Sequence, residues 1–389
     1  MKYCFDKIYR RDRTNSVKYD LRSKFFGDSE VLPLWVADMD FRVAEEIRLA
    51  IADRAADPVY GYTFWGSEGK KAFVDWVGKR HGWAVSENHL SFSPGVVPAL
   101  SFLMSALTEE GDKVLIQPPV YHPFKEVVGT NGRALVNNPL VLRDGRYYMD
   151  FDGLESEFAD GVRMMFLCNP HNPSGRMWEA AELAKVADLA KKYGVIVVSD
   201  EIHSDLALKG RKHIPYLSVA DEGIVCMAPS KTFNLAGLSS SVLVIPDAQQ
   251  KLLFEKELRK FHISGNLFGF EAMDAAYKHG ESWLAQVLEY IEGNVEFMAE
   301  YISEYMPAIK MMEPEASYLV WLDCTGLGLD AVALNDLIVK DARLGLNDGR
   351  MFGAGGKGYQ RVNVACPRAV VVQAMDRLYK ALEAKGLLS

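Results

Sequence analysis

The sequence lacks the cysteine spacing of a metal site or of a disulfide framework. It contains five cysteines in 389 residues, scattered along the chain with no CxxC pair: Cys4, Cys168, Cys226, Cys324 and Cys366. Zinc sites and small disulfide-rich folds need closely spaced, paired cysteines. Two of the five lie in strand-like apolar runs, so we expect buried free thiols in a reducing cytoplasm, and no metal site.

Long apolar runs and basic blocks are also missing. No uninterrupted apolar stretch approaches the length needed to cross a bilayer. The N-terminus, MKYCFDKIYRRDR, has no apolar core followed by a cleavage site, as a signal peptide would have. The net charge of −8 and the absence of a basic cluster argue against nucleic acid as the main partner. We therefore expect a cytoplasmic globular protein with neither a membrane nor a nucleic-acid partner.

What the chain does contain is an alternation of strand-like and helix-like segments. The apolar runs are nearly continuous, as in strands covered on both faces: residues 113–119, 164–170, 195–201, 224–230 and 241–246. Between two of them, residues 179–194 form a strong helix pattern that stops at Gly194. Strand, helix and strand at this spacing predict right-handed crossovers and an α/β fold with a mostly parallel sheet.

From about residue 281, the regular alternation of strand-like and helix-like segments ends. A long helix is predicted over 281–306, strands over 317–323 and 359–365, and a last helix that opens with Pro367 and ends at Gly386. The length suits two domains. We predict a large domain over 46–285 and a smaller α+β domain over 286–389, with the N-terminal segment 1–45 contributing to the smaller one.

Two of the predicted strand ends carry loops that could bind a ligand, because ligands of open α/β sheets bind at the carboxyl ends of strands. In FSPGVVPAL (92–100), a helix follows Gly95, so the free N–H groups of Gly95, Val96 and Val97 would form a seat for phosphate. An ordinary tight loop is the alternative. In NPHNPSG (169–175), two prolines and a glycine hold Asn172, although Asn-Pro turns are common.

Two further strand ends carry ionisable residues. Asp200 directly follows an apolar run in SDEIHSD, and a buried acid needs a cationic or proton-donating partner; a helix N-cap is the alternative. His203, three residues on, could simply be exposed. Lys231 stands in CMAPSKTFNLAGL, where it either reaches solvent from a strand end or lies inside a site.

These four strand ends together fit one cofactor, pyridoxal 5′-phosphate (PLP). It needs a lysine amine for its aldehyde, an acid for its ring nitrogen and anion contacts for its phosphate. The lysine must be partly desolvated so that enough of it is neutral to react. We therefore predict that Lys231 lies inside a site.

The same motifs resemble the fold-type I PLP enzymes, the aspartate aminotransferase superfamily, over essentially the whole chain. Within it, four segments are similar to the bacterial MalY/PatB group of cystathionine β-lyases: LPLWVADMDF (32–41), SKTFNLAGL (230–238), LNDGRMFG (346–353) and RVNVACPR (361–368). The resemblance implies a large domain with a mostly parallel seven-stranded sheet between helices, plus a smaller α+β domain.

The resemblance also implies roles for individual residues. Lys231 would bind the cofactor covalently and later move the substrate's α-proton, Asp200 would pair with the ring nitrogen, and Asn172 would contact the 3′ oxygen and the substrate. Tyr121 would stack on the ring, unless it is a core tyrosine. Arg361 would grip the α-carboxylate as a bidentate fork, unless it forms a surface ion pair.

Further implied contacts concern the phosphate and the substrate. Tyr62 would reach the phosphate of the neighbouring subunit's cofactor and the substrate, which requires a homodimer. Ser230 would add a phosphate contact, and His203 would lie beside the cofactor. Trp35, in the N-terminal segment, would line the substrate pocket, and this segment would form part of its wall.

Three departures from related patterns stand out. His203 replaces the tyrosine that aminotransferases carry three residues after the acid, as in the C–S lyases. Ser239 stands where many aminotransferases place a phosphate-binding arginine, and no replacement cation is evident. Ala316 stands where the lyases would have glycine, which could alter the local turn.

We therefore expect α,β-elimination of L-cystathionine or a related L-cysteine S-conjugate to a thiol, pyruvate and ammonia. An aminotransferase acting on an L-amino acid with the same site is the first alternative. A regulatory protein that binds a transcription factor, a second role known in the MalY group, is another.

Overall fold

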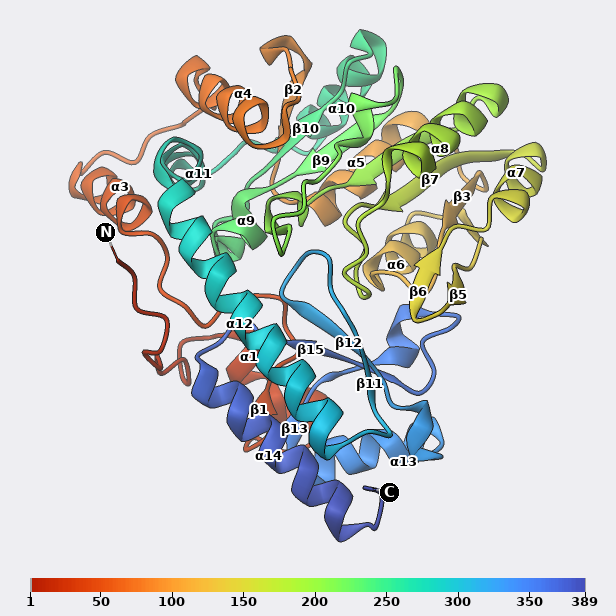
Figure 1. Ribbon diagram of the computed structural model, residues 1–389. Coiled ribbons are helices and arrows are strands. Elements are labelled where there is room, and N and C mark those ends of the chain that lie inside the picture. The colour runs from red at the N-terminus through yellow and green to blue at the C-terminus, as the bar shows by residue number, and fades with distance from the viewer. Residues whose placement is uncertain (1, 389) are drawn as a thin grey trace.

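A seven-stranded sheet forms the centre of the protein, whose computed structural model describes residues 2–388 (Figure 1). The strand order is β2-β10-β9-β8-β7-β3-β4. Only β10 runs antiparallel to its neighbours, so the predicted, mostly parallel α/β sheet is confirmed. The strands are β2 (Leu90–Ser93), β3 (Lys113–Ile116), β4 (Ala134–Asn137), β7 (Val162–Cys168), β8 (Ile196–Asp200), β9 (Ile224–Met227) and β10 (Ser241–Val244).

Helices cover both faces of this sheet. Along β7, Met164 and Phe166 pack in one apolar cluster with α5, α6 and α10, whereas Met165 and Leu167 pack in the other with α4, α7, α8 and α11. Burial on both faces explains why the strands read as continuous apolar runs. The helices around the sheet are α3 (Glu45–Ala56), α4 (Ser67–His81), α5 (Val96–Leu107), α6 (Pro123–Thr130), α7 (Phe151–Ala159), α8 (Ala180–Tyr193), α10 (Ala248–Lys260) and α11 (Leu267–His279).

The helix predicted over 179–194 is α8. Its C-terminal cap is Gly194, with a φ of 68° in the left-handed region, where glycine is unstrained.

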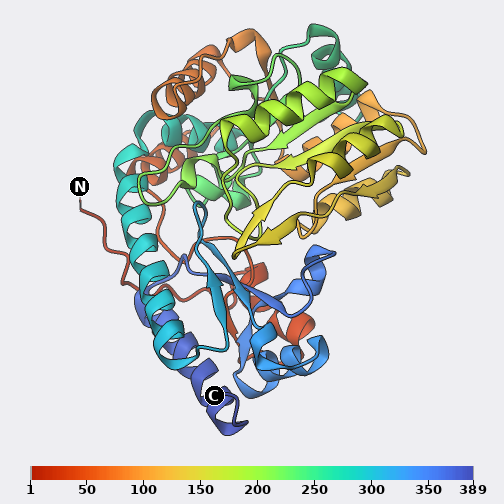
Figure 2. The same ribbon diagram turned by 45° about the vertical axis from the view of Figure 1, so that its right-hand side comes forward.

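A smaller four-stranded antiparallel sheet, ordered β11-β12-β15-β14, lies below the central one (Figure 2). The long helix α12 (Glu281–Tyr305) runs from one part to the other, and α14 packs against it. The last helix begins at Arg368, because Pro367 is its N-cap and not its first residue. The elements are β11 (Lys310–Met312), β12 (Leu319–Asp323), β14 (Asn347–Asp348), β15 (Tyr359–Asn363), α13 (Ala331–Asp336) and α14 (Arg368–Ala384).

The start of the chain joins this smaller part. Strand β1 (Leu32–Pro33) pairs in parallel with β13 (Leu344–Gly345). The remaining short elements are α1 (Val17–Asp20), α2 (Arg22–Phe26), α9 (Pro229–Thr232) and the hairpin of β5 (Val141–Arg143) and β6 (Arg146–Tyr148). The division of the chain at residues 45 and 285 stays a prediction.

Buried charges fix the segment that follows β1, residues 35–41, which we call the strap. Lys18 is fully buried, and its Nζ lies 2.7 Å from the Asp40 carboxylate. Arg11 pairs with both Asp38 and Asp40, each at 2.6 Å. An unpaired buried charge is costly, so these contacts hold the strap in one position.

Neither a membrane span nor a metal cluster is found in the described chain. No helix of residues 2–388 is long and apolar enough to cross a bilayer. Those residues also contain no group of three histidine, cysteine, aspartate or glutamate side chains that could hold a metal. Four of the cysteines are buried and free, while Cys4 is exposed.

We expect Asp40→Ala to lower the free energy of unfolding by about 3–5 kcal/mol, because it leaves the Lys18 ammonium buried without its closest partner. The matched control is Asp75→Ala, which breaks an exposed ion pair with Lys71 and should cost less than about 1 kcal/mol. Urea denaturation of both variants measures the difference. Equal, small losses would contradict the structural importance of the Lys18–Asp40 pair.

Candidate active site

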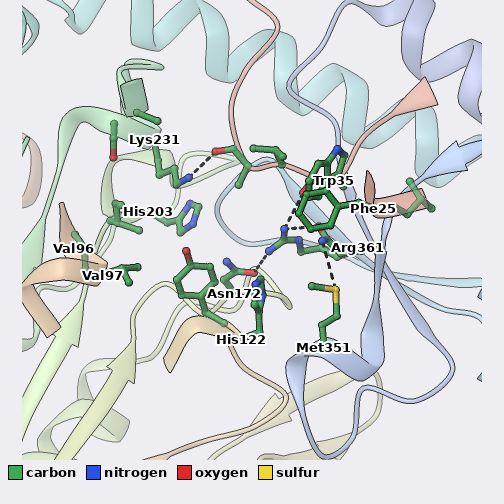
Figure 3. Close-up of a pocket in the computed structure, with 18 of the residues that line it drawn as sticks. Phe25, Trp35, Val96, Val97, His122, Asn172, His203, Lys231, Met351 and Arg361 are labelled. Carbon is green, nitrogen blue, oxygen red and sulfur yellow. Dashed lines mark hydrogen bonds between the residues drawn. The ribbon is translucent and has the colours of Figure 1, made fainter. Parts of the chain in front are cut away.

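A cavity of about 690 Å³ opens at the carboxyl ends of the central strands, facing the smaller sheet. Of the residues that the sequence predicted for the site, Tyr62 alone does not line it. Those that do are Trp35, Gly95, Val96, Val97, Tyr121, Asn172, Asp200, His203, Ser230, Lys231 and Arg361. Figure 3 shows several of them, from both sheets and the strap, pointing into the same space.

Lys231 reaches this cavity from α9, the short turn after β9. Its Nζ donates a hydrogen bond of 2.7 Å to the backbone carbonyl of Ala37 in the strap (Figure 3). Burial and, to a smaller extent, the charge of Arg361 lower the pKa of the amine to about 8, although Asp38 and Asp200 oppose the shift. The amine therefore lies inside the protein and is partly neutral at neutral pH, so it does not reach out to solvent from a strand end.

The turn that carries Lys231 is held from two sides. On one side, the buried Asp205 carboxylate accepts hydrogen bonds of 3.0 Å from Thr232 Oγ1 and Trp76 Nε1. On the other, the Asn234 side chain bonds the backbone N–H and carbonyl of Met39 at 2.9 and 3.0 Å. These contacts limit the positions that the lysine stem can take.

Asp200 is the last residue of β8, and its carboxylate is buried at the floor of the cavity. One oxygen accepts from the backbone N–H of Ile202 at 3.1 Å; the other has no hydrogen-bond partner among residues 2–388. Burial raises the pKa of this carboxyl to about 7. The next helical turn is capped by His203, so the alternative role of Asp200 as a helix cap is wrong.

His203 is buried beside Lys231 and not exposed. Its Nδ1 lies 3.2 Å from Ser317 Oγ. Burial and, to a smaller extent, the charges of Lys231 and Arg361 lower the pKa of the imidazole to about 3. The ring is therefore neutral at physiological pH.

Arg361 projects from β15 and is buried, so the alternative of a surface ion pair is wrong. Its guanidinium donates to three neutral oxygens: Asn172 Oδ1 at 2.9 Å, the Trp35 carbonyl at 3.0 Å and Asn347 Oδ1 at 2.6 Å. Its Nε is buried without a partner in residues 2–388. Burial lowers the pKa of the group to about 10, which still leaves it charged.

The loop that holds Asn172 is packed tightly against the smaller part. Gly175, with a φ of 70°, accepts hydrogen bonds from the backbone N–H groups of Glu315 and Ala316. A Cβ at Gly175 would lie 2.9 Å from the Ala316 carbonyl, so only glycine fits there. Ala316 itself is tolerated, because the positive φ of this turn, 76°, falls on Ser317.

The other end of the cavity suits an anion. Helix α5 begins at Val96 with Gly95 as its N-cap, so its first free N–H groups lie at the cavity wall. Ser230 and Ser239 line the same cavity. Besides Lys231 and Arg361, the only cationic side chain among the described lining residues is Lys340, which pairs with Asp336 at 2.9 Å. Among the lining residues of the described chain, no additional unpaired cation stands in for the arginine that many aminotransferases carry at the position of Ser239.

Tyr121 lines the cavity, and burial raises the pKa of its hydroxyl to about 12. It is therefore not simply a core tyrosine. Its neighbour His122, which the sequence did not single out, has a pKa lowered to about 4 by burial, and its Nδ1 is buried without a partner in the described chain.

Sequence reasoning also missed an apolar wall. Phe25 and Phe26 of α2 pack on Trp35, with ring centroids 4.7 and 5.4 Å away. Met351 lines the cavity beside Asn347. Met351 and Asn347 fall in LNDGRMFG and Trp35 falls in LPLWVADMDF, two segments that the sequence had marked, whereas Phe25 and Phe26 fall in none of them.

Tyr62 lies outside this cavity and is fully exposed, and its neighbours Tyr60 and Phe64 are exposed to a smaller extent. Its predicted contact is with the cofactor of a second subunit, so it stays a prediction.

The residues present fit PLP. The cavity offers a desolvated amine, a buried carboxyl with one unpartnered oxygen, a helix N-terminus and a guanidinium with an unpartnered N–H. These are the groups that the aldehyde, the ring nitrogen, the phosphate and an amino-acid carboxylate require.

We expect Asp200→Asn to stabilise the cofactor-free protein more strongly at pH 8 than at pH 5. A folded-state pKa of about 7 lies above the unfolded value of about 4, so the folded chain binds the proton more tightly. The stability of the wild type therefore falls as the pH rises from about 4 to about 7, by on the order of a few kcal/mol. Melting temperatures at both pH values test this, with the exposed Asp75→Asn as the control. A stabilisation that does not depend on pH would contradict the raised pKa.

Comparison with known proteins agrees with this site. Residues 29–378 match the family described as aminotransferase class I and II. Cystathionine beta-lyase PatB of Bacillus subtilis (strain 168) is 44% identical over 384 residues, which cover 97% of this chain and 99% of PatB.

Two solved structures are similar over almost the whole length. Cystalysin from Treponema denticola, which contains PLP, superposes with a TM-score of 0.94 at 33% identity, covering 99% of this chain and 100% of cystalysin. The PLP-bound C–S lyase from Staphylococcus hominis has a TM-score of 0.92 at 33% identity, covering 98% of each chain. The chain thus belongs to the aminotransferase class I and II family, with the fold of the fold-type I PLP enzymes.

Proposed function

We propose that this protein is a PLP-dependent β-lyase, which cleaves the carbon–sulfur bond of L-cystathionine or a related L-cysteine S-conjugate. The convergence of Lys231, Asp200 and Arg361 on one cavity carries the proposal. The identity to PatB favours elimination over transamination. The reaction consumes one water and yields a thiol, pyruvate and ammonia.

Several side chains would hold the cofactor. Lys231 supplies the amine for the aldehyde, and Asp200, once ionised, pairs with the protonated ring nitrogen. The cofactor's phosphate would be bound by the N-terminus of α5 and by hydroxyl groups. The other contacts come from Asn172, Tyr121, His203, Gly95, Val96, Val97 and Ser230.

Arg361 would bind the substrate's α-carboxylate, because a buried guanidinium with an unpartnered N–H lacks an anionic partner. The hydrogen bonds that the guanidinium donates to Asn172 and Asn347 fix its orientation in the cavity. Trp35 contacts the same guanidinium through its backbone carbonyl and forms, with Phe25, a wall for the sulfur substituent.

The proton at the substrate's α-carbon would be removed by Lys231. When bound, the cofactor supplies an electron sink for the electrons that this proton leaves behind. An amine with a pKa of about 8 is partly neutral at pH 7 to 8, so it can accept a proton and later return one. The apolar wall and the strap exclude bulk water from the amine, and the departing thiolate takes up a proton.

The protein would act as a homodimer with shared active sites in the cytoplasm. Tyr62, exposed on this chain, would contact the phosphate of the neighbouring subunit's cofactor and the substrate. The exposed Val59, Tyr60 and Phe64 around it form an apolar strip suited to burial in such an interface.

Purified protein with PLP should release pyruvate and thiol from L-cystathionine in equal amounts over many turnovers, without a 2-oxo acid. A coupled dehydrogenase measures pyruvate, and a thiol reagent measures the thiol. Lys231→Ala is expected to lose the reaction completely. A single conversion to the pyridoxamine form, with turnover only after a 2-oxo acid is added, would identify an aminotransferase instead.

Arg361→Lys should lower kcat/KM by about 100-fold or more, because an ammonium cannot form the bidentate contact with a carboxylate. Steady-state kinetics on L-cystathionine measure the loss. Arg350→Lys, in an exposed pair with Asp348, is the matched control. Similar kcat/KM values for both variants would exclude Arg361 as the carboxylate's partner.

A further inference from the structure

One backbone oxygen in the cavity serves two buried side chains. The Ala37 carbonyl accepts a hydrogen bond of 2.7 Å from Lys231 Nζ and another of 3.0 Å from Tyr318 Oη. Tyr318 directly precedes β12 and is fully buried, and its ring packs edge-on against His203, 6.2 Å away. A carbonyl oxygen has two lone pairs, so these two donors occupy both.

The position of this carbonyl does not depend on Tyr318. On either side of it, the carbonyls of Val36 and Asp38 each accept a 2.7 Å hydrogen bond from Asn363 Nδ2. The Trp35 carbonyl is bound by Arg361. The strap would therefore stay in place if the Tyr318 hydroxyl were removed, and the effect of the hydroxyl on Lys231 is electrostatic.

We propose that Tyr318 is a positioning residue for Lys231, which acts through the Ala37 carbonyl to orient the amine and to disfavour its charged form. The hydroxyl proton of Tyr318 points at the oxygen that the amine also faces, so its positive end opposes an ammonium there. With one lone pair occupied, the carbonyl accepts a single N–H from the amine, and the lone pair of the neutral amine is left for reaction. This inference rests on the proposed function, in which the neutral amine reacts.

The other groups around the amine act in opposite directions on its charge. Asp38 and Asp200 both favour the ammonium form, while burial and Arg361 disfavour it. The neighbouring His203 is neutral and adds no charge. Tyr318 therefore adds to the few groups that keep Lys231 able to capture an aldehyde and accept a proton.

The test is Tyr318→Phe in the full-length chain, freed of cofactor and mixed with PLP. The rate of aldehyde capture is followed by absorbance as a function of pH. The midpoint of this profile should rise by about half to one pH unit, which slows capture at pH 7 by about 3- to 10-fold. Incorporation of 3-fluorotyrosine at position 318, a stronger donor, should shift the midpoint downward.

Tyr147→Phe is the matched control. This tyrosine is also buried, but its hydroxyl contacts Trp321 Nε1 at 3.5 Å outside the cavity, so the midpoint should not move. A purely structural role for Tyr318 would lower the melting temperature and leave the pH profile unchanged. An unshifted midpoint in folded Tyr318→Phe overturns the inference, whereas a wild-type chain that captures no PLP overturns the proposed function instead.

Discussion

The rest of this structure depends on the burial of two cationic side chains, Lys231 and Arg361, in one cavity. Neither forms an ion pair with a carboxylate of residues 2–388. Within residues 2–388, Lys231 and Arg361 form hydrogen bonds only to carbonyl and amide oxygens, and burial lowers the pKa of each. Removing a charge from water costs several kcal/mol, and neutral oxygens offset only part of this. Asp200 does not balance them fully, because its own pKa is raised to about 7. The cavity therefore favours a ligand that brings negative charge, which a cofactor phosphate and an amino-acid carboxylate would both supply.

The fold supports this arrangement from three directions. Parallel strands deliver Asp200, the Asn172 loop and the Lys231 turn to one edge of the sheet. The smaller sheet delivers Arg361 from the opposite side. The strap lies between them and contributes backbone carbonyls in place of side chains. Asparagine amides, at Asn234 and Asn363, hold that backbone with several hydrogen bonds each. The strap is thus positioned by hydrogen bonds from neutral amide side chains, and the buried ion pairs of Asp38 and Asp40 hold it as well.

The sequence predicted the residues at the strand ends of this site, but not the contacts that close the cavity around them. The apolar run that ends in Asp200 and the Gly95 that precedes a helix have local physical meanings, and the structure places both as predicted. The sequence could not choose between an exposed and a buried His203, because the answer depends on contacts with Ser317 and Tyr318, at least 114 residues further along the chain. The hydrogen bonds from Lys231 and Arg361 to the strap could not be predicted either. They end on backbone carbonyl oxygens, which every residue type has, so no side chain in the sequence marks them. Phe25 and His122 carry no motif and join the cavity only through tertiary packing.

The strap also ties the site to the order in which the chain is made. Its contacts span 194 residues to Lys231 and 326 residues to Arg361, which are very non-local and slow to form. During synthesis, the strap emerges early, and its contacts with Arg361 and Asn363 cannot form until the last strand of the smaller sheet has followed it. A ribosome-bound chain can build much of the central sheet, yet it cannot enclose the amine of Lys231. Closure of the cavity around Lys231 is thereby delayed until the polypeptide is almost finished.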